Sequence, residues 1–292
     1  MPQTGFFGWR ADGTRTSAPQ PAASSPLRAR HRELKLKFAA LQQEYAGLHT
    51  ALFEAAQVHR RLCAPRLVRC GEYDIASEIF AVRYLPGDFF TVEETDGGTI
   101  LALGDVCGKG LAAGMWTPCL VGLVRAHAAA SSEPQAIVTG VNREFCRMHA
   151  PLTSLLMARL DPASGTLDYC SAGHPPALLL RANGQLEFLS EGGMLLGMAP
   201  DASFRRGRVV LGAGDVLLAY SDGVIESRND AEQEFGWERL EAQLRLAGNS
   251  SADAVLFSVL GAVQDFAAPR ELIDDTSLVV IRQGDVIPDA AR

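Results

Sequence analysis

Hydrophobic and polar positions in the first part of the chain follow the spacing of a long helix. Apolar side chains recur alternately four and three residues apart, which is the heptad spacing of a helix that packs along one seam. The seam positions are Leu34, Phe38, Leu41, Tyr45, Leu48, Leu52, Ala55, His59 and Leu62. Pro65 ends the pattern. We therefore expect a helix over residues 30–64, which either pairs with a second copy through residues 34–62 or packs on the domain that follows.

From about residue 71 onward, short apolar runs between Gly, Asp, Asn and Pro turns predict strands joined in hairpins. The expected strands are Tyr73–Arg83, Phe89–Glu94, Thr99–Leu103, Ser154–Leu160, Thr166–Ser171, Ala177–Arg181, Gln185–Leu189, Val209–Leu211, Val216–Tyr220 and Ser277–Arg282. Runs with helical periodicity predict helices at Gly110–Ala130, Pro134–His149, Trp237–Leu246 and Ser251–Phe266. Because strands and helices do not alternate regularly, the pattern favours a layered α+β fold over a doubly wound parallel sheet.

Composition sets the domain organisation that we expect. Residues 1–29 are rich in Pro, Ser, Ala, Gly and Arg and should be disordered. Residues 65–284 carry the strand and helix patterns of one domain that is large enough to hold a catalytic site. We expect residues 285–292 to form a flexible tail. The whole chain has 292 residues, of which 47% are hydrophobic and 21% charged.

Charge and cysteine usage exclude several classes of function. The net charge of −7 argues against nucleic-acid binding, which depends on Lys and Arg neutralising phosphates. No apolar stretch approaches the roughly 20 residues of a membrane span, and the N-terminus lacks the pattern of a signal peptide. The six cysteines show no C-x-x-C pair and no disulfide framework, so we expect a cytoplasmic location.

Four aspartates lie where a strand-like run meets a Gly turn or loop: Asp88, Asp105, Asp222 and Asp274. Aspartate is a poor strand former and is rarely buried without a partner. Any one of them alone fits an ordinary turn. Together they indicate carboxylates that converge on hard cations, since oxygen ligands suit Mg²⁺ or Mn²⁺. Two such ions about 4 Å apart can hydrolyse phosphate esters.

Three other motifs fail when their chemistry is considered. Cys119 and Arg125 have the spacing of a cysteine phosphatase, but an apolar helical run separates them in place of a phosphate-binding loop. Ser221 follows a strand as a nucleophile would, yet the last histidine is His174, so none follows it. Lys109 lies between two glycines without the remaining residues of a Walker motif, and we expect a turn there.

The motifs together resemble the metal-dependent serine/threonine protein phosphatases (the PPM family), in the bacterial SpoIIE/RsbU branch. The matching segments, in the family's order, are P-G-D-F-F at 86–90, G-D-V-C-G-K-G at 104–110, S-A-G-H-P-P at 171–176, the Gly193–Gly197 loop, S-D-G-V-I-E at 221–226 and D-D-T-S at 274–277. Arg61–Pro65 also resembles the linker that precedes these domains. The resemblance covers residues 60–282 and implies an α-β-β-α sandwich of two antiparallel sheets flanked by helices.

The resemblance also implies a role for each matching residue. Asp105 bridges two metal ions, the carbonyl of Val106 joins one of them, and Asp222 and Asp274 complete the ligand set. Asp88 lies beside them as a direct or water-mediated ligand. A hydroxide held by the two ions, Mn²⁺ or Mg²⁺, then attacks the phosphorus of a phosphoserine or phosphothreonine, and no protein nucleophile is needed.

Two positions depart from the family pattern, and two further residues have secondary roles. Pro86 replaces the first Gly of G-G-D, and Thr91 stands where an acidic residue is common. Asp275 is expected beside the metal ligands, and His174 is expected to be structural. The departures keep two alternatives open: a weakly active or inactive partner-binding module of the same fold, and a small-molecule phosphatase.

The family branch implies a partner and a mode of regulation. Its members act on small anti-sigma-factor antagonist proteins, so a phosphorylated protein of that kind is the expected substrate. Regulation usually enters through the N-terminal helix. We therefore expect dimerisation or a partner to move the helix at residues 30–64 and so to complete the metal site.

Overall fold

The structure, a computed structural model, describes residues 26–62, 65–82, 84–95 and 97–283. It divides into two compact units, residues 1–50 and residues 51–292, which are considered separately. The C-terminal tail expected at residues 285–292 lies outside the described residues. Within the described part, no helix is both long enough and apolar enough to cross a membrane.

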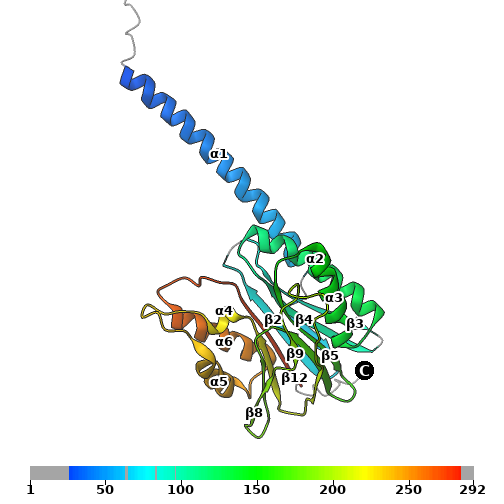
Figure 1. Cartoon of the computed structure of the whole chain (residues 1–292). Helices are drawn as coiled ribbons and strands as arrows, with labels where there is room; N and C mark the ends of the chain where they lie inside the picture. Colours follow the sequence, from blue (N-terminus) through cyan, green and yellow to red (C-terminus); the bar gives the residue numbers. More distant parts are fainter. Residues whose placement is uncertain (1–25, 63–64, 83, 96, 284–292) are drawn as a thin grey trace, which may run out of the picture. The chain divides into compact units, whose positions relative to one another are not determined.

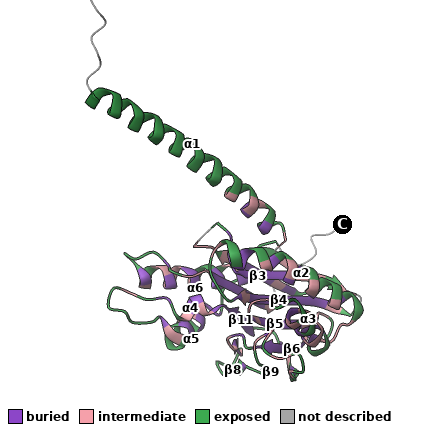
Figure 2. Ribbon diagram, turned by 45° about the horizontal axis from the view of Figure 1, so that its top comes forward, coloured by how far each residue is buried: buried purple, intermediate pink, exposed green. Residues whose placement is uncertain are grey.

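Helix α1 (Pro26–Arg60) contains most of the residues of the heptad seam. It begins at Pro26, a few residues before the expected start at residue 30. Residues 1–25 of the segment predicted to be disordered lie outside the described residues. The first five seam residues are 58–66% exposed: Leu34, Phe38, Leu41, Tyr45 and Leu48. Figure 2 shows an exposed helix along most of α1 and burial only toward its C-terminal end, where Ala56 and His59 are buried.

Two β-sheets form the centre of the second unit (Figure 1). The first sheet has the order β1-β2-β12-β11-β7-β8 and is antiparallel throughout. Its strands are β1 (Leu67–Cys70), β2 (Tyr73–Phe80), β12 (Thr276–Gln283), β11 (Val216–Tyr220), β7 (Ala177–Leu180) and β8 (Leu186–Leu189). The second sheet has the order β10-β6-β5-β4-β3, with β9 parallel to β6. Its strands are β10 (Gly207–Val210), β6 (Thr166–Ala172), β5 (Thr153–Asp161), β4 (Gly98–Val106), β3 (Asp88–Thr95) and β9 (Gly192–Gly193).

Helices cover the outer face of each sheet. α2 (Leu111–Ala130) and α3 (Pro134–Met148) pack on the second sheet. α4 (Asp222–Ile225), α5 (Gly236–Ala247) and α6 (Ala252–Ala267) pack on the first. A separate apolar core fills the space between the two sheets. The order helix, sheet, sheet, helix confirms the predicted α+β sandwich.

Alternation along the strands explains why both faces of each sheet are buried. Successive side chains of a strand point to opposite faces. In β11, Leu218 lies in the core beneath α5 and α6, whereas its neighbour Leu217 lies between the sheets. In β5, Met157 faces α2 and α3, and Leu156 faces the other sheet. A strand that is buried on both faces has apolar residues at consecutive positions instead of alternate ones, and the sequence contains such runs.

The predicted elements agree with the structure except at a few places. The four helices predicted after residue 100 are present as α2, α3, α5 and α6. The strand predicted at Tyr73–Arg83 ends earlier, at Phe80, because the chain then turns and the Val82 N–H donates to a carboxylate instead of a neighbouring strand. β1, β9 and α4 were not predicted.

Candidate active site

Asp88 and Asp105 lie directly opposite each other on β3 and β4 of the second sheet. Asp88 is only 2% exposed. The hydroxyl of Ser277, on β12 of the first sheet, donates to Asp88 Oδ2 at 2.5 Å. The Asp88 carboxylate therefore sits where the two sheets meet and is held from both of them.

Gly87 lies beside two oxygen atoms, the carbonyl oxygen of Val106 and a carboxylate oxygen of Asp105. A Cβ atom at Gly87 would lie 3.0 Å from the carbonyl oxygen of Val106 and 3.1 Å from Asp105 Oδ1. The Val106 N–H donates to the Gly87 carbonyl at 3.3 Å, which fixes the two segments against each other. The Val106 carbonyl and the Asp105 carboxylate thus lie close to the same point, and glycine leaves both of them uncovered.

Asp222 and Asp274 reach the same region from the first sheet. β11 ends at Tyr220, and Asp222 is the first residue of the short helix α4. The Ser221 N–H donates to the Ser277 carbonyl at 3.0 Å, so the end of β11 stays paired with β12. A Cβ atom at Gly223 would collide with the Asp275 carbonyl oxygen. The absence of a side chain at Gly223 therefore allows the Asp222 turn to pack against the segment that carries Asp274 and Asp275.

Asp275 holds the chain in front of Asp88. Its Oδ1 accepts the Val82 N–H at 2.9 Å, and its Oδ2 accepts the Gly87 N–H at 3.0 Å. Both carboxylate oxygens are thus engaged by the backbone that leads into β3. This arrangement makes Asp275 a support for the position of Asp88.

Lys109 places a positive charge among these carboxylates. Its Nζ lies 2.5 Å from Asp274 Oδ2 and 3.5 Å from the Ile273 carbonyl oxygen. The side chains of Lys109 and Asp274 remain 46% and 45% exposed. The predicted turn at residues 108–110 is present, but the ion pair was not predicted.

The carboxylates raise one another's pKa. Burial, and then the charge of Asp105, raise the pKa of Asp88 well above its ordinary value. Burial, and then the charge of Asp222, raise the pKa of Asp105 to about 6. Burial and the charge of Asp274 raise the pKa of Asp222 in the same way. Carboxylates that disfavour one another's ionised form make a site that a cation stabilises.

The donor set fits a hard divalent cation. Carboxylates and one backbone carbonyl provide oxygen ligands only, which is the set that Mg²⁺ and Mn²⁺ prefer. The Lys109 ammonium already contacts one of these carboxylates as a positive partner. Across the described residues, no three His, Cys, Asp or Glu side chains meet in a geometry ready to hold a metal ion.

The remaining predicted residues lie outside the carboxylate cluster. The His174 Nδ1 lies 2.9 Å from the Ser154 hydroxyl, and burial lowers the pKa of His174 to about 3. The imidazole is therefore neutral and buried beside Ser154, and the structural role predicted for His174 stays a prediction. Thr91 is buried, and its hydroxyl donates to Glu93. Cys119 and Arg125 both lie on α2, with no phosphate loop between them.

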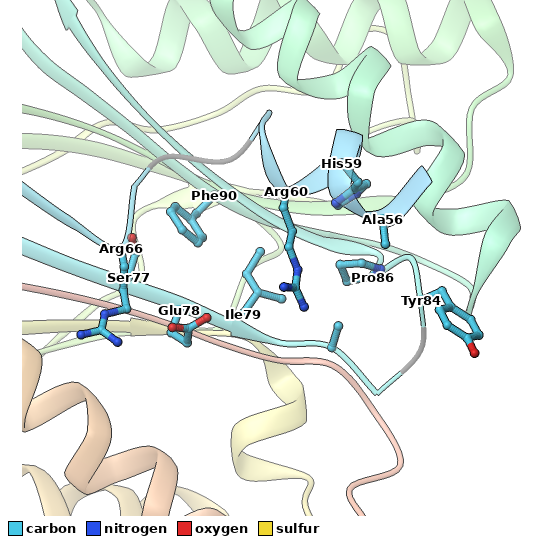
Figure 3. Close-up of a pocket in the computed structure, with 11 residues that line it drawn as sticks. Ala56, His59, Arg60, Arg66, Ser77, Glu78, Ile79, Tyr84, Pro86 and Phe90 are labelled. Carbon is cyan, nitrogen blue, oxygen red and sulfur yellow. The ribbon is translucent and has the colours of Figure 1, made fainter. Parts of the chain in front are cut away.

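A pocket lies between the end of α1 and the segment that leads into β3 (Figure 3). Its cavity volume is about 230 Å³. His59 and Arg60 line it from α1, Glu78 from β2, and Pro86 from the segment before Asp88. The Nε2 atom of His59 is buried and has no hydrogen-bond partner among the described residues. The departure at Pro86 therefore faces the base of α1.

Comparison with known proteins identifies one protein family and several relatives. The Stage II sporulation protein E family, SpoIIE, matches residues 95–284. Phosphoserine phosphatase RsbU of Bacillus subtilis (strain 168) is 24% identical over 238 residues, which cover 78% of this chain and 69% of RsbU. Protein IcfG of Synechocystis sp. is 23% identical over 239 residues, which cover 72% of this chain and only 37% of IcfG. The chain thus spans little more than a third of the length of IcfG.

Solved structures share the fold. The SiaA-PP2C domain of Pseudomonas aeruginosa superposes with a TM-score of 0.71 at 17% identity, covering 84% of this chain and 99% of that domain. RsbX, solved in complex with magnesium, superposes with a TM-score of 0.56 at 14% identity, covering 74% of this chain and 97% of RsbX.

The two-sheet sandwich and the family match define a protein phosphatase domain of the PP2C type, within the metal-dependent PPM phosphatases. The chain belongs to the SpoIIE family, in the branch that includes RsbU.

Proposed function

We propose that this chain removes phosphate from a phosphoserine or phosphothreonine of a partner protein with the help of two divalent metal ions. One observation supports the proposal: Asp88 lies opposite Asp105 on neighbouring strands, and the charges of Asp222 and Asp274 act on Asp105 from the other sheet.

Each residue of the cluster has its own proposed role in holding the two ions. Asp105 lies at the centre of the cluster, since its pKa responds to Asp88, Asp222 and Asp274, and it would bridge the two ions. Asp222, Asp274 and the Val106 carbonyl would hold them from the outside, with Asp88 as a direct or water-mediated ligand. The bound ions would lower the pKa of a water molecule enough to supply hydroxide at neutral pH. Both Mn²⁺ and Mg²⁺ accept this ligand set.

The proposed substrate is a phosphorylated signalling protein of the anti-sigma-factor antagonist kind. The match to a protein named phosphoserine phosphatase supports the serine ester. Two alternatives follow from the departures at Pro86 and Thr91: a partner-binding module with little activity, and a phosphatase for small molecules. The clustering of four aspartates argues against the first, because like charges without a metal are unfavourable.

Hydrolysis of p-nitrophenyl phosphate with and without Mn²⁺ tests the chemistry. We expect metal-dependent turnover in the wild type and its loss in Asp105→Asn and Asp222→Asn. Asp201→Asn is the matched control, since Asp201 is an exposed carboxylate outside the segments that carry the four aspartates. Wild-type protein without turnover at any Mn²⁺ concentration would favour the binding module. Faster turnover of sugar or nucleotide phosphates than of a phosphorylated protein would favour the small-molecule enzyme.

We also propose that α1 regulates the site. Its first heptads expose an apolar seam (for example Leu41, 62% exposed) that suits a second copy of the chain. Near its C-terminal end, Ala56 and His59 are buried and line the pocket that Pro86 also lines. Movement of this end of α1 would act on the segment that positions Asp88.

Two deletions test this regulation. Removing residues 1–60 should change the turnover rate or the Mn²⁺ dependence, whereas removing residues 1–25 should change neither. Light scattering on the full chain and on Leu41→Asp shows whether the seam pairs. A rate and metal requirement unaffected by the larger deletion would refute the proposal.

A further inference from the structure

Lys109 is presented at the site by the turn between β4 and α2. β4 ends at Val106 and α2 begins at Leu111. Gly108 and Gly110 flank Lys109 with φ angles of 119° and 70°, which other residues rarely adopt. The tight turn thus carries a long cationic side chain from the end of the strand that bears Asp105 toward the segment that bears Asp274.

The contacts of Lys109 are those of a counter-ion. Its ammonium pairs with Asp274 Oδ2 at 2.5 Å and lies 3.5 Å from the Ile273 carbonyl oxygen. In the part of the chain that the structure describes, no other Lys or Arg forms an ion pair with one of the four aspartates of the cluster. Among the described residues, Lys109 is therefore the basic side chain that forms an ion pair with the cluster.

This pair is easy to exchange. Both side chains are nearly half exposed, so solvent screens their attraction. A divalent ion carries twice the charge of an ammonium and accepts several carboxylates at once. A metal ion that takes Asp274 as a ligand must therefore displace Lys109, whose flexible four-carbon stem lets the ammonium move to another anion.

A phosphate ester supplies that anion at the same place. Its non-bridging oxygens are negatively charged, and Lys is an established partner of phosphate. We propose that Lys109 has two successive roles: it neutralises Asp274 while the metal is absent, and after displacement it binds the phosphoryl oxygens of the substrate. The second role rests on the proposed phosphatase function.

The two roles make opposite predictions for one substitution. In Lys109→Ala, Mn²⁺ should bind about three- to tenfold more tightly, because the competing ammonium is gone. In the same variant the inhibition constant of inorganic phosphate and the KM for p-nitrophenyl phosphate should rise about tenfold, which corresponds to one lost charge-assisted contact. Lys109→Arg keeps the charge and should bind phosphate nearly as the wild type does. Arg147→Ala, which removes an exposed cation of α3, is the control for net charge.

Calorimetry of Mn²⁺ binding to the metal-free protein gives the first quantity, and phosphate inhibition kinetics give the second. Tighter Mn²⁺ binding together with weaker phosphate inhibition in Lys109→Ala supports the proposal. Unchanged or weaker Mn²⁺ binding refutes the counter-ion role, and an unchanged phosphate constant refutes the substrate role. If Lys109→Ala does not fold, Lys109→Gln takes its place.

A failure of the proposed roles of Lys109 can be told apart from a failure of the proposed phosphatase function. Wild-type protein that turns over neither p-nitrophenyl phosphate nor a phosphoprotein would refute the phosphatase assignment. Calorimetry of inorganic phosphate binding to the Mn²⁺-loaded protein would then decide whether Lys109 binds phosphate.

Discussion

Replacing Asp105 with Asn should stabilise the metal-free protein while it removes the activity. A carboxyl whose pKa rises from 3.8 in the unfolded chain to about 6 in the folded one disfavours the folded state once it is ionised. Below pH 3.8 the carboxyl is protonated in both states, and the folded protein has its full stability. This stability is lost as the pH rises through about 6. The cost is on the order of 3 kcal/mol at pH 7.5 and roughly half of that at pH 5.

Asparagine has nearly the same shape and no charge, so it escapes this cost. We expect Asp105→Asn to raise the free energy of unfolding by about 3 kcal/mol at pH 7.5, and by about half as much at pH 5. At about 2–4 °C per kcal/mol for a domain of this size, the midpoint of thermal unfolding should rise by about 6 °C or more.

Urea unfolding in EDTA, at both pH values, measures this difference. Asp201→Asn serves as the control for loss of an exposed carboxylate and should leave stability unchanged. Saturating Mn²⁺ should stabilise the wild type strongly and the variant weakly, because the variant lacks the carboxylate that we propose bridges the two ions. A metal-free Asp105→Asn protein that is no more stable than the wild type at pH 7.5 would refute the electrostatic reasoning.

Two further substitutions test the contacts that assemble the site. Ser277→Ala removes the hydroxyl that donates to buried Asp88 and should lower the free energy of unfolding by about 1–3 kcal/mol; urea unfolding that matches the wild type would contradict this. Gly223→Ala introduces a methyl group against the Asp275 carbonyl and should cost more than about 2 kcal/mol with loss of Mn²⁺-dependent turnover. In Gly122→Ala, where nothing lies within 4 Å of the added methyl group, stability should hold or rise by up to about 1 kcal/mol, and equal effects of the two glycine substitutions would refute the steric argument.

The sequence predicted the elements whose pattern is long or bounded by clear signals. α3 begins with Pro134 at its first position, and α6 begins after Ser251, whose hydroxyl accepts the Ala254 N–H as an N-cap. The strands buried on both faces were visible as apolar runs. β1 (Leu67–Cys70) and β9 (Gly192–Gly193) were not, because a four-residue edge strand and a two-residue bridge carry too little pattern.

The four aspartates were predicted from their turn contexts and the family motifs, yet their supporting contacts were not. The Ser277 hydroxyl meets Asp88 across 189 residues, and Lys109 meets Asp274 across 165 residues. Such pairs depend on how the two sheets stack, which no local pattern encodes. Both residues lie inside the recognised motifs, as the last Ser of D-D-T-S and the Lys of G-K-G. A search for polar side chains beside each aspartate would have selected both.

The placement of Asp88 has a consequence for how the enzyme could be controlled. Asp88 and Asp105 belong to one sheet, Asp222 and Asp274 to the ends of strands in the other, and Ser277 and Asp275 hold the two groups together. The distance between the two halves of the site is therefore set by the spacing of the sheets. With the four aspartates as the proposed metal ligands, a displacement of one sheet by a fraction of an ångström, from any input, would change the affinity for metal without replacing any of them. Metal affinity then becomes a measure of how closely the two layers are stacked.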